Sequence, residues 1–381
     1  MRNVYRLPPW RMRKSMLALD VGVDWAAELM GLYAAWKTTR GAYPGGKVRF
    51  LSIDTGVQCD RHTFKSNHPD LLGQLKAAKD FTGSPFGYCD VNGHGTATVG
   101  LIAGKNDGLN IEGVCSDGEF YIAKALGDDG TGDNTWISRA IDWGRDLDVD
   151  IITFSGGSDE RDDEVIQAME RFLSGRDQRF MVAAAGNNGK TNGVNWPAAH
   201  PDCLAVGAID RNGVATDFSS RGAEVDIAAP GKDVRSCALD SKWGLFDGTS
   251  FSAPLVAGAV GLLLAKHRMP GNHATPLNNI TQLRHHLNAI ARHVTDLDGN
   301  SYPIARADEM LAADDAPPIV PEKPRKALRI GPFRWSMPAR GDDLISLGVA
   351  DDAPADERNN AAATLSAMME SLAMVVDSKT V

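Results

Sequence analysis

The chain has 381 residues, a length that suits two or three domains or one large domain with appendages. Hydrophobic residues make up 43% and charged residues 23%, which excludes fibrous, collagen-like and wholly disordered architectures. The formal net charge is −9, whereas binding to a nucleic-acid backbone needs a basic face, so we expect no nucleic-acid partner. No run of about 18 uncharged apolar residues is present, so we expect no membrane partner.

Cysteine usage and the N-terminus both bear on the cellular compartment. Five cysteines in a chain of this length predict reduced thiols rather than a disulfide framework. The N-terminus is basic, but Asp20 and Asp24 interrupt the apolar stretch that a secretory signal needs. We therefore expect no signal peptide and a cytoplasmic location.

The first 37 residues contain two expected segments. Residues 1–20 form a basic arm with the sequence Leu7-Pro8-Pro9-Trp10, which should be extended because proline fixes φ and bars a helix. Residues 24–37 are expected to form a helix, because apolar side chains recur on one of its faces. These apolar residues are Leu29, Leu32, Tyr33 and Trp36.

From about residue 48 to residue 313, apolar strands alternate with helical segments, and glycine-rich turns follow the strands. This alternation predicts an α/β fold, with a mostly parallel sheet and helices on both faces. Functional sites in such folds lie at the carboxyl ends of the strands. The expected strands are Val48–Ile53, Phe120–Ala125, Ile151–Phe154, Phe180–Ala185 and Cys203–Ala208.

The character of the chain changes at Pro317. Four prolines between residues 317 and 324 predict a stiff linker, and residues 325–358 look irregular. Residues 360–376 carry apolar side chains at helical spacing. That helix could dock on the body, pair with a second subunit in a homodimer, or form a marginal tail. We therefore divide the chain into an arm (1–20), one large α/β body (21–316) and a tail (317–381).

A carboxylate follows the first expected strand of the body, in Ile53-Asp54-Thr55-Gly56. Such a triplet can simply end a strand. It also occurs in aspartic proteases, where two carboxylates share one proton. This chain has one such triplet, so that interpretation requires a homodimer.

A histidine and an asparagine occupy two further glycine-bearing turns. His94 lies in Asn92-Gly93-His94-Gly95-Thr96 at the start of a helical run, where the flanking glycines expose the imidazole. Asn187 lies in a turn that follows the apolar run 180–182. Residues 184–191 also match a loose nucleotide-binding loop, but the residues after it are a poor helix start, which weakens an ATPase interpretation.

A serine opens the most apolar helix of the chain. Ser250 lies in Asp247-Gly248-Thr249-Ser250, just before a stretch that is apolar on nearly all sides and therefore buried. Ser250 could be a helix cap, or a nucleophile whose backbone amide faces a developing oxyanion. Both roles are compatible in one residue.

Asp, His, Asn and Ser thus occur in this order, each in a glycine-bearing turn beside a strand or a helix. Here the sequence resembles the subtilisin-like serine proteases, whose triad has the chain order Asp, His, Ser. The resemblance covers about residues 21–313 and has the closest character to the intracellular subtilisins. It rests on Ile53-Asp54-Thr55-Gly56, Asn92-Gly93-His94-Gly95-Thr96, Ala185-Gly186-Asn187 and Gly248-Thr249-Ser250-Phe251-Ser252-Ala253-Pro254.

The resemblance implies a serine endopeptidase and assigns four catalytic roles. Ser250 would attack the peptide carbonyl, His94 would move the proton, and Asp54 would orient the imidazole. The Asn187 amide and the Ser250 backbone N–H would stabilise the oxyanion. A catalytically silent binding module with the same fold is the alternative.

Polypeptide substrates should bind as an added strand. The stretches that match the family's substrate-lining segments are Gly130-Thr131-Gly132 and Phe154-Ser155-Gly156. Asn195 aligns with the base of the pocket for the residue that precedes the scissile bond. Gly156 stands where subtilisins commonly have leucine, so the subsite preferences of the family do not carry over.

The resemblance also implies a structural calcium ion. The carboxylates of Asp70 and Asp107 would bind it, together with main-chain carbonyls of Lys105, Leu109 and Ile111, since Ca²⁺ prefers oxygen ligands. The alternative is a plain solvated loop. A zinc site built from Cys59, His62, His68 and Cys89 is disfavoured because the spacing is irregular.

The N-terminal arm suggests a restraint on activity. Only about 20 residues precede the matching region, as in the intracellular subtilisins, whose short extension carries an element similar to Leu7-Pro8-Pro9-Trp10. An extended arm can add to the substrate-binding edge, and its prolines would resist cleavage. The alternative is a basic tail without a role.

Overall fold

The computed structural model describes residues 4–16, 24–60, 62–63, 65–108, 110–189, 193–271, 273, 276–288 and 290–315, together with three short strands beyond residue 316. The chain divides into two units, residues 1–316 and residues 317–381. The first unit contains the α/β body and the N-terminal arm. Each unit is described by itself.

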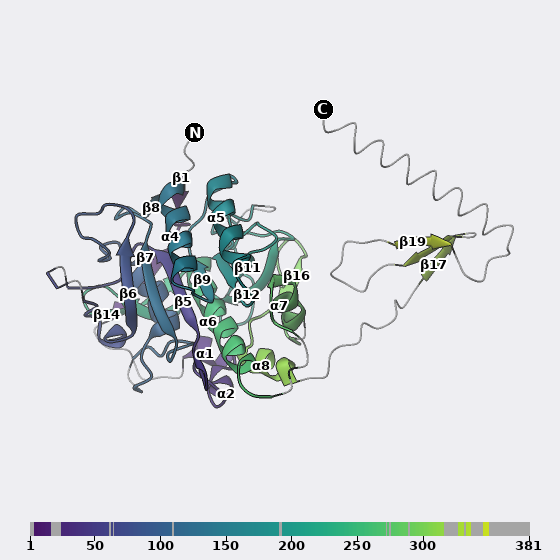
Figure 1. Ribbon diagram of the computed structural model, residues 1–381, viewed down its shortest axis with the longest axis horizontal. Helices are drawn as coiled ribbons and strands as arrows, with labels where there is room; N and C mark the ends of the chain where they lie inside the picture. The colour runs from purple at the N-terminus through teal and green to yellow at the C-terminus, as the bar shows by residue number, and fades with distance from the viewer. Residues whose placement is uncertain are drawn as a thin grey trace. The chain divides into compact units, whose positions relative to one another are not determined.

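A seven-stranded parallel sheet forms the centre of the body (Figure 1). Its strand order is β12-β11-β10-β9-β5-β7-β6, and every neighbouring pair is parallel. The predicted parallel α/β architecture is confirmed. The strands are β5 (Arg49–Asp54), β6 (Leu75–Asp80), β7 (Glu119–Lys124), β9 (Ile151–Phe154), β10 (Phe180–Ala184), β11 (Leu204–Ile209) and β12 (Val225–Pro230).

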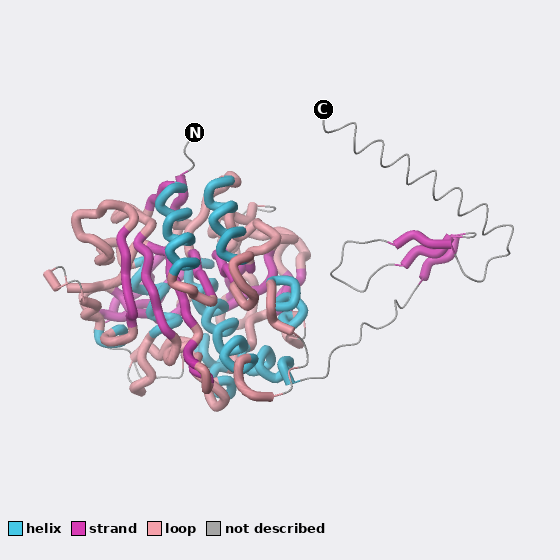
Figure 2. The backbone as a smooth tube through the Cα atoms, in the orientation of Figure 1, coloured by secondary structure: helices cyan, strands magenta, loops and turns pink. Residues whose placement is uncertain are grey.

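Helices cover both faces of this sheet. In Figures 1 and 2, α4 (Asn134–Asp146) and α5 (Asp163–Leu173) lie side by side over one face. Helices α3 (His94–Ala103) and α6 (Thr249–His267) pack against each other and against the sheet strands. Helix α6 is buried from Thr249 to Ala265, because apolar side chains surround it on all sides.

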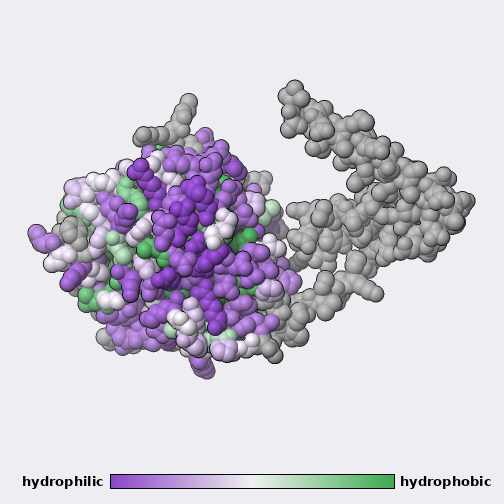
Figure 3. All heavy atoms as spheres, in the orientation of Figure 1, coloured by the Kyte–Doolittle hydropathy of each residue, from purple (hydrophilic) through white to green (hydrophobic). Residues whose placement is uncertain are grey.

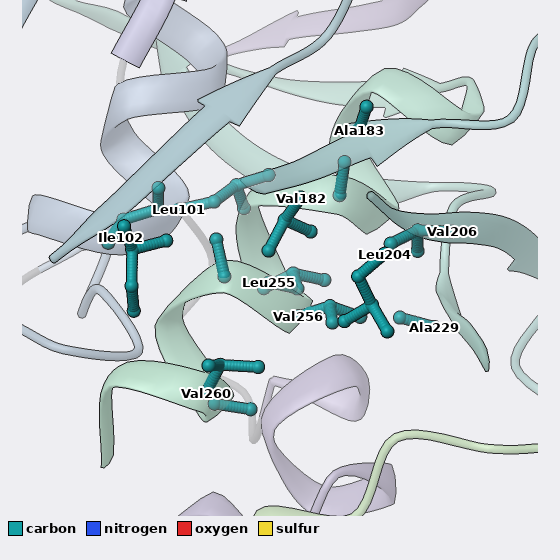
Figure 4. Close-up of a cluster of buried hydrophobic side chains, with 14 of the residues drawn as sticks. Leu101, Ile102, Val182, Ala183, Leu204, Val206, Ala229, Leu255, Val256 and Val260 are labelled. Carbon is teal, nitrogen blue, oxygen red and sulfur yellow. The ribbon is translucent and has the colours of Figure 1, made fainter. Parts of the chain in front are cut away.

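The core between α6 and the sheet is tightly filled. Figure 4 shows Leu255, Val256 and Val260 of α6 facing the strand residues Val182 and Leu204. All five side chains are buried. This close packing holds α6 in place, and with it the residues at its N-terminus.

Two observations distinguish α6 from a membrane-spanning helix. By length and composition the helix could cross a bilayer, but 94% of the relevant window is buried inside the body. The molecular face that carries α4 and α5 is largely hydrophilic (Figure 3). We therefore interpret α6 as the core helix of a globular fold.

The N-terminal arm forms two strands that pair with the body. Strand β1 (Val4–Arg6) pairs antiparallel with β8 (Thr131–Asp133). Strand β2 (Arg11–Met16) pairs antiparallel with β14 (Lys242–Asp247), which itself pairs with β13 (Val234–Ala238). Residues 7–10 connect the two strands and include Pro8 and Pro9.

The helix expected over residues 24–37 is two short helices instead. Helix α1 (Trp25–Leu29) is capped by Asp24, and α2 (Leu32–Ala35) follows after Gly31. Gly31 has a left-handed φ of 65°, and a Cβ there would clash with the Asp308 carboxylate. The chain therefore turns at Gly31 where the apolar periodicity alone would continue a helix.

The remaining elements are short. They are β3 (Ala42–Tyr43), β4 (Gly46–Lys47), a 3₁₀ turn at Pro69–Leu71, α7 (Ile280–Leu287), β15 (His293–Thr295), β16 (Ser301–Pro303) and α8 (Ala307–Asp315). The second unit has an antiparallel sheet of β17 (Ala327–Ile330), β18 (Phe333–Ser336) and β19 (Ser346–Val349), within a stretch expected to be irregular. The helix expected over residues 360–376 lies outside the described residues.

The expectation of five reduced thiols is wrong, because Cys59 and Cys89 form a disulfide. Their Cα atoms are 5.2 Å apart, since parallel bridging at Val57 and Cys89 brings the two loops together. Thirty residues separate the two cysteines, so their proximity could not be read from spacing. Cys115, Cys203 and Cys237 are free and buried.

Candidate active site

An aspartate and a histidine meet at the carboxyl edge of the sheet. Asp54 is the last residue of β5, and His94 is the first residue of α3. The Nδ1 atom of His94 lies 2.8 Å from Asp54 Oδ1, and both side chains are at most 1% exposed. The Thr98 hydroxyl and the Thr55 N–H donate to the same carboxylate. Asp54 therefore fixes the orientation of the imidazole.

Close backbone approach explains two of the glycines. A Cβ on Gly95 would collide with the Gly56 carbonyl oxygen, and a Cβ on Gly56 would collide with the Tyr88 carbonyl oxygen. Gly56 also has a φ of 110°, a value that side chains disfavour. Only glycine at both positions lets the Asp54 and His94 turns touch.

Asp90 organises the turn that presents His94, and the sequence analysis missed it. Its Oδ1 accepts from the Thr55 hydroxyl and from the backbone N–H groups of Asn92 and Gly93. Its Oδ2 accepts from the N–H and the hydroxyl of Thr96. An aspartate four residues before the first residue of α3 was the available signal.

Ser250 is the second residue of α6 and is completely buried. Gly248 precedes the helix with a φ of 148°, and a Cβ there would come within 3.0 Å of Asn187 Nδ2. The Ser250 hydroxyl donates to the Ser155 carbonyl oxygen at 3.1 Å, and the Ser155 hydroxyl donates to the Ser250 carbonyl oxygen at 2.9 Å. Ser155 thus connects β9 to the start of α6.

Asn187 points a single amide group into the cleft. Its Oδ1 accepts from both the N–H and the hydroxyl of Thr249, each at 2.8 Å. These bonds fix the amide orientation, so Nδ2 faces outward and donates to the Pro9 carbonyl oxygen at 2.9 Å. The Pro9 carbonyl of the arm is therefore the acceptor for the outward-facing amide of Asn187.

The arm crosses the whole cleft as a bound peptide would. On one side Arg6 exchanges two backbone hydrogen bonds with Gly157, and the Leu7 N–H donates to the Gly130 carbonyl. Tyr5 is fully buried, and its ring lies 6.0 Å from that of Phe154. The predicted extended arm is thus present, and it lies in the cleft.

The other side of the arm packs against His94. The Trp10 ring lies 5.3 Å from the His94 ring and 6.2 Å from the Phe251 ring. Further along, Arg13 forms ion pairs with Asp247 and with Asp233. Polar and apolar contacts therefore hold the arm on both sides of residues 8 and 9.

Ser250 and His94 are not joined in this arrangement. Among the described residues, no group hydrogen-bonds to His94 Nε2, although this atom is buried. The Ser250 hydroxyl is directed at Ser155 instead. The arm-bound site therefore has its Asp–His bond formed and its Ser–His bond open.

The expected substrate-binding residues surround the arm. The arm strand β1 and Leu7 run alongside Gly130, Thr131 and Gly132. Phe154 contacts Gly156, and its ring also lies beside Tyr5 of the arm. The pairing with the arm on the second edge is made by Gly157, one residue beyond the expected stretch, and the sequence analysis missed it.

A cavity of about 560 Å³ lies beside the arm. Asn195 is 8% exposed, lines this cavity and donates through Nδ2 to Asp159 Oδ1 at 3.1 Å. Asp159 and Glu160 make one wall acidic. Among the residues of the body that line this cavity are thus one buried amide and two carboxylates.

The residues expected to bind calcium come together in part. Asp70 is buried, and its Oδ2 accepts from the Ile111 N–H at 3.1 Å and from the Trp243 indole N–H at 2.6 Å. The Lys105 N–H donates to the Asp70 carbonyl oxygen, which folds the loop onto this segment. N–H donors therefore use one carboxylate oxygen, and a cation would have to use the other. Asp107 is exposed, and Leu109 lies outside the described residues.

Two competing interpretations lose their basis. The Cys59–Cys89 disulfide removes the thiolates that the zinc site needed, and both nitrogens of His68 have protein partners. A nucleotide-binding loop must open into a helix, but residues 193–200 form none. Lys190 and Thr191 of that loop lie outside the described residues.

Comparisons with known proteins agree with the geometry of the site. A model described as the subtilase family matches residues 50–302. An intracellular serine protease of Paenibacillus polymyxa is 35% identical over 244 residues, which cover 62% of this chain and 71% of that protein. Subtilisin E of Bacillus subtilis is 33% identical over 230 residues, which cover 59% of this chain and 57% of that protein.

A third relative is, like the first, named as an intracellular serine protease. The major intracellular serine protease of Bacillus subtilis is 33% identical over 228 residues, which cover 58% of this chain and 69% of that protein. The chain therefore spans only a little more than half of subtilisin E but about 70% of the two intracellular proteases.

Proposed function

Since the chain belongs to the subtilase family, and its enzyme class is that of a subtilisin-like serine endopeptidase, we propose that Asp54, His94 and Ser250 are its catalytic triad. The observation that carries this assignment is the 2.8 Å contact between His94 Nδ1 and the buried Asp54 carboxylate. Ser250, the second residue of α6, is the proposed nucleophile. Asn187 supplies the side-chain donor for the oxyanion.

The proposed reaction uses these groups in turn. When the Ser250 hydroxyl turns from Ser155 to His94, Nε2 accepts its proton and Oγ attacks the peptide carbonyl. The oxyanion accepts hydrogen bonds from Asn187 Nδ2 and the Ser250 N–H. His94 then protonates the leaving amine, and a water molecule hydrolyses the acyl-enzyme by the same route. Asp54 stabilises the imidazolium in both halves.

The nucleophile is tested with two serine variants of the same helix. Ser250→Ala should abolish hydrolysis of a peptide substrate and retain the fold by circular dichroism. Ser252→Ala is the matched control, because its hydroxyl donates to carbonyls of β12 and touches neither His94 nor Asn187. Residual activity of Ser250→Ala above a trace would remove Ser250 from this role.

We also propose that the arm at residues 1–18 inhibits the enzyme from within. Two contacts of the arm support this: Asn187 Nδ2 donates to the Pro9 carbonyl oxygen, and the Trp10 ring packs on that of His94. In this arrangement the Ser250 hydroxyl donates to Ser155 and not to His94. Proline at positions 8 and 9 restricts the backbone away from attack geometry. A tether also gives an effective concentration in the millimolar range, so weak intrinsic affinity suffices.

Removal of the arm tests this proposal. A chain that begins near Leu17 should have a much higher kcat/KM towards a short peptide than the full chain, at equal active-site titre. Adding the peptide of residues 1–18 should reverse the gain. Equal kcat/KM for the two chains would refute inhibition by the arm.

The substrates proposed are polypeptides, and the acidic cavity favours a basic side chain. Asp159 and Glu160 line the cavity next to Pro9, with the buried Asn195 amide at its base. A lysine or arginine would place its charge against these carboxylates, whereas a phenylalanine would desolvate them. Asp159→Asn should reduce kcat/KM for basic peptides more than for leucine peptides; an equal effect on both would contradict the preference.

Calcium binding and a cytoplasmic location are further parts of the proposal. Calcium would use Asp70 and Asp107 together with loop carbonyls, as a structural ion remote from the reaction.

The cytoplasmic location is supported by two relatives whose names call them intracellular. The Cys59–Cys89 disulfide argues against that compartment, because disulfides are rare in the cytosol. Differential alkylation in acid-quenched cells tests this, since a fully oxidised pair would indicate an oxidising compartment. Pairing of two chains through the tail stays a prediction.

A further inference from the structure

A cluster of two histidines and one aspartate lies at the opposite end of α6 from Ser250. His267 is the last residue of α6, His273 follows in the next loop, and Asp314 lies near the end of α8. The Asp314 side chain is 0% exposed, that of His267 10% and that of His273 21%. The cluster is remote from the catalytic residues, which lie at the first turn of the same 19-residue helix.

Both oxygens of the buried carboxylate face an imidazole nitrogen. His267 Nδ1 lies 2.8 Å from Asp314 Oδ1, and His273 Nδ1 lies 2.8 Å from Asp314 Oδ2. The two imidazole rings are 4.4 Å apart. Each carboxylate oxygen is therefore held by a different imidazole.

The surroundings of His273 require a cation. Its Nε2 lies 3.0 Å from the Met269 carbonyl oxygen, which can only accept, so Nε2 carries a hydrogen. Its Nδ1 faces a carboxylate, which also only accepts. A neutral imidazole has one N–H and cannot serve two acceptors. Either a second proton or a metal ion must therefore lie on the Nδ1 side.

A second cluster in the body shows what a satisfied histidine looks like. His68, Asp70 and Cys237 are buried together, but His68 Nδ1 accepts from the Asp70 N–H while Nε2 contacts the Lys242 carbonyl oxygen. One nitrogen thus faces a donor and the other an acceptor, which a neutral ring satisfies. That cluster calls for no cation, whereas the cluster around Asp314 does.

From these contacts we propose that His267, His273 and Asp314 bind a divalent transition metal, with zinc as the preferred ion. Two imidazoles and a carboxylate match the ligand preference of Zn²⁺, and their ligand atoms lie within 4.8 Å of one another. Ligand atoms in a tetrahedral zinc site are roughly 3.3 Å apart, so a small opening of the 2.8 Å contacts admits the ion.

The hydrogen bond to the Met269 carbonyl acts as the outer support of this site. A histidine that binds metal usually donates its other N–H to a carbonyl or carboxylate, which fixes the tautomer and the ring orientation. The bond from His273 Nε2 to Met269 makes Nδ1 the ligating atom. The metal would join the end of α6 to α8 and to the loop between them, and so stabilise the last helix of the body.

The test uses the full chain without a polyhistidine tag, with Ser250→Ala to prevent self-digestion. Adding Co²⁺ should produce the visible d–d absorption of a tetrahedral site, and Zn²⁺ should abolish it. Free Zn²⁺ at one hundred times its Kd should raise Tm by roughly 5 °C. His273→Ala should lose both effects, and His293→Ala, which removes an exposed histidine elsewhere, should keep them.

Three outcomes overturn the proposal. One is the absence of Co²⁺ absorption, and another is a zinc-induced rise in Tm that is equal in His273→Ala and His293→Ala. The third is a cluster that responds to pH alone, which would mean that a proton fills the place assigned to the metal. All three readouts are independent of proteolysis, so they do not depend on the catalytic proposal.

Discussion

Asn187 illustrates how single side chains are oriented in this site. The two donors of Thr249 hold its Oδ1, so its Nδ2 can only face the cleft. The sequence predicted Asp54, His94, Asn187 and Ser250 as candidate catalytic residues, because each lies in a glycine-bearing turn after a strand or before a helix. It missed Asp90 and Gly157, because their roles depend on contacts between loops that are distant in sequence.

Asn187→Ala should lower kcat by roughly 10²–10³ with a smaller change in KM, because the lost hydrogen bond forms mainly in the transition state. This magnitude is the one known for the oxyanion asparagine of a subtilisin and is taken over from there. Steady-state kinetics on the arm-free chain measure it. A loss confined to KM would show that Asn187 only binds substrate.

Asp90→Ala should impair both stability and catalysis, since five donors lose their acceptor. We expect a loss of at least about 2 kcal/mol in the free energy of unfolding. Displacement of His94 should reduce kcat by roughly 10²-fold. The matched control is Asp60→Ala, which removes a turn carboxylate in the connection between β5 and β6 that, among the described residues, accepts only from His62 and Thr63 of its own turn. Wild-type kcat in Asp90→Ala would contradict a positioning role.

At the scale of elements, the arm carries the proposed inhibition. Proline content predicted its extended form, and the family resemblance suggested that it adds to the substrate-binding edge. Individual pairing partners such as Gly157 could not be derived, because they lie some 150 residues away. Five of the seven sheet strands were predicted, since continuous apolar runs mark buried parallel strands. The two edge strands, β6 and β12, were missed. The break at Gly31 escaped prediction, because it depends on the distant Asp308.

Tyr5→Phe should tighten the arm. Tyr5 is fully buried, and its hydroxyl has no hydrogen-bond partner among the described residues. Burial also raises the pKa of this phenol, so it stays neutral. Removing an unpaired buried hydroxyl should lower the inhibition constant of the 1–18 peptide by about tenfold. Val4→Ala, at an exposed neighbouring position, should change it little. Weaker inhibition by the Tyr5→Phe peptide would contradict the burial of this ring.

At the scale of the whole molecule, the first unit carries the proposed catalytic groups and two proposed metal sites. The parallel sheet sets the carboxyl edge where β5 and β10 end, and α6 runs from Ser250 to the histidine cluster. Composition predicted the globular class. It gave a wrong expectation for the cysteines, because a single disulfide in a larger chain leaves no pattern in the spacing.

Removal of calcium should lower Tm by several degrees if the ion binds beside Asp70, because a ligand bound only by the folded state stabilises it. Asp107→Ala should abolish this response, and differential scanning calorimetry with and without a calcium-selective chelator measures it. A Tm unmoved by the chelator, together with no calcium in elemental analysis, would mean that protein donors alone hold this carboxylate.

Covalent labelling of Ser250 tests the central claim most directly. A fluorophosphonate should react with the chain that begins near Leu17, and mass spectrometry should find the adduct on Ser250 alone. The full chain should react far more slowly, because the arm occupies the Asn187 amide and packs Trp10 on His94, while the Ser250 hydroxyl is directed at Ser155. If Ser250 of the truncated, folded chain took no label, the protein would be a silent binding module, and the triad would have to be abandoned.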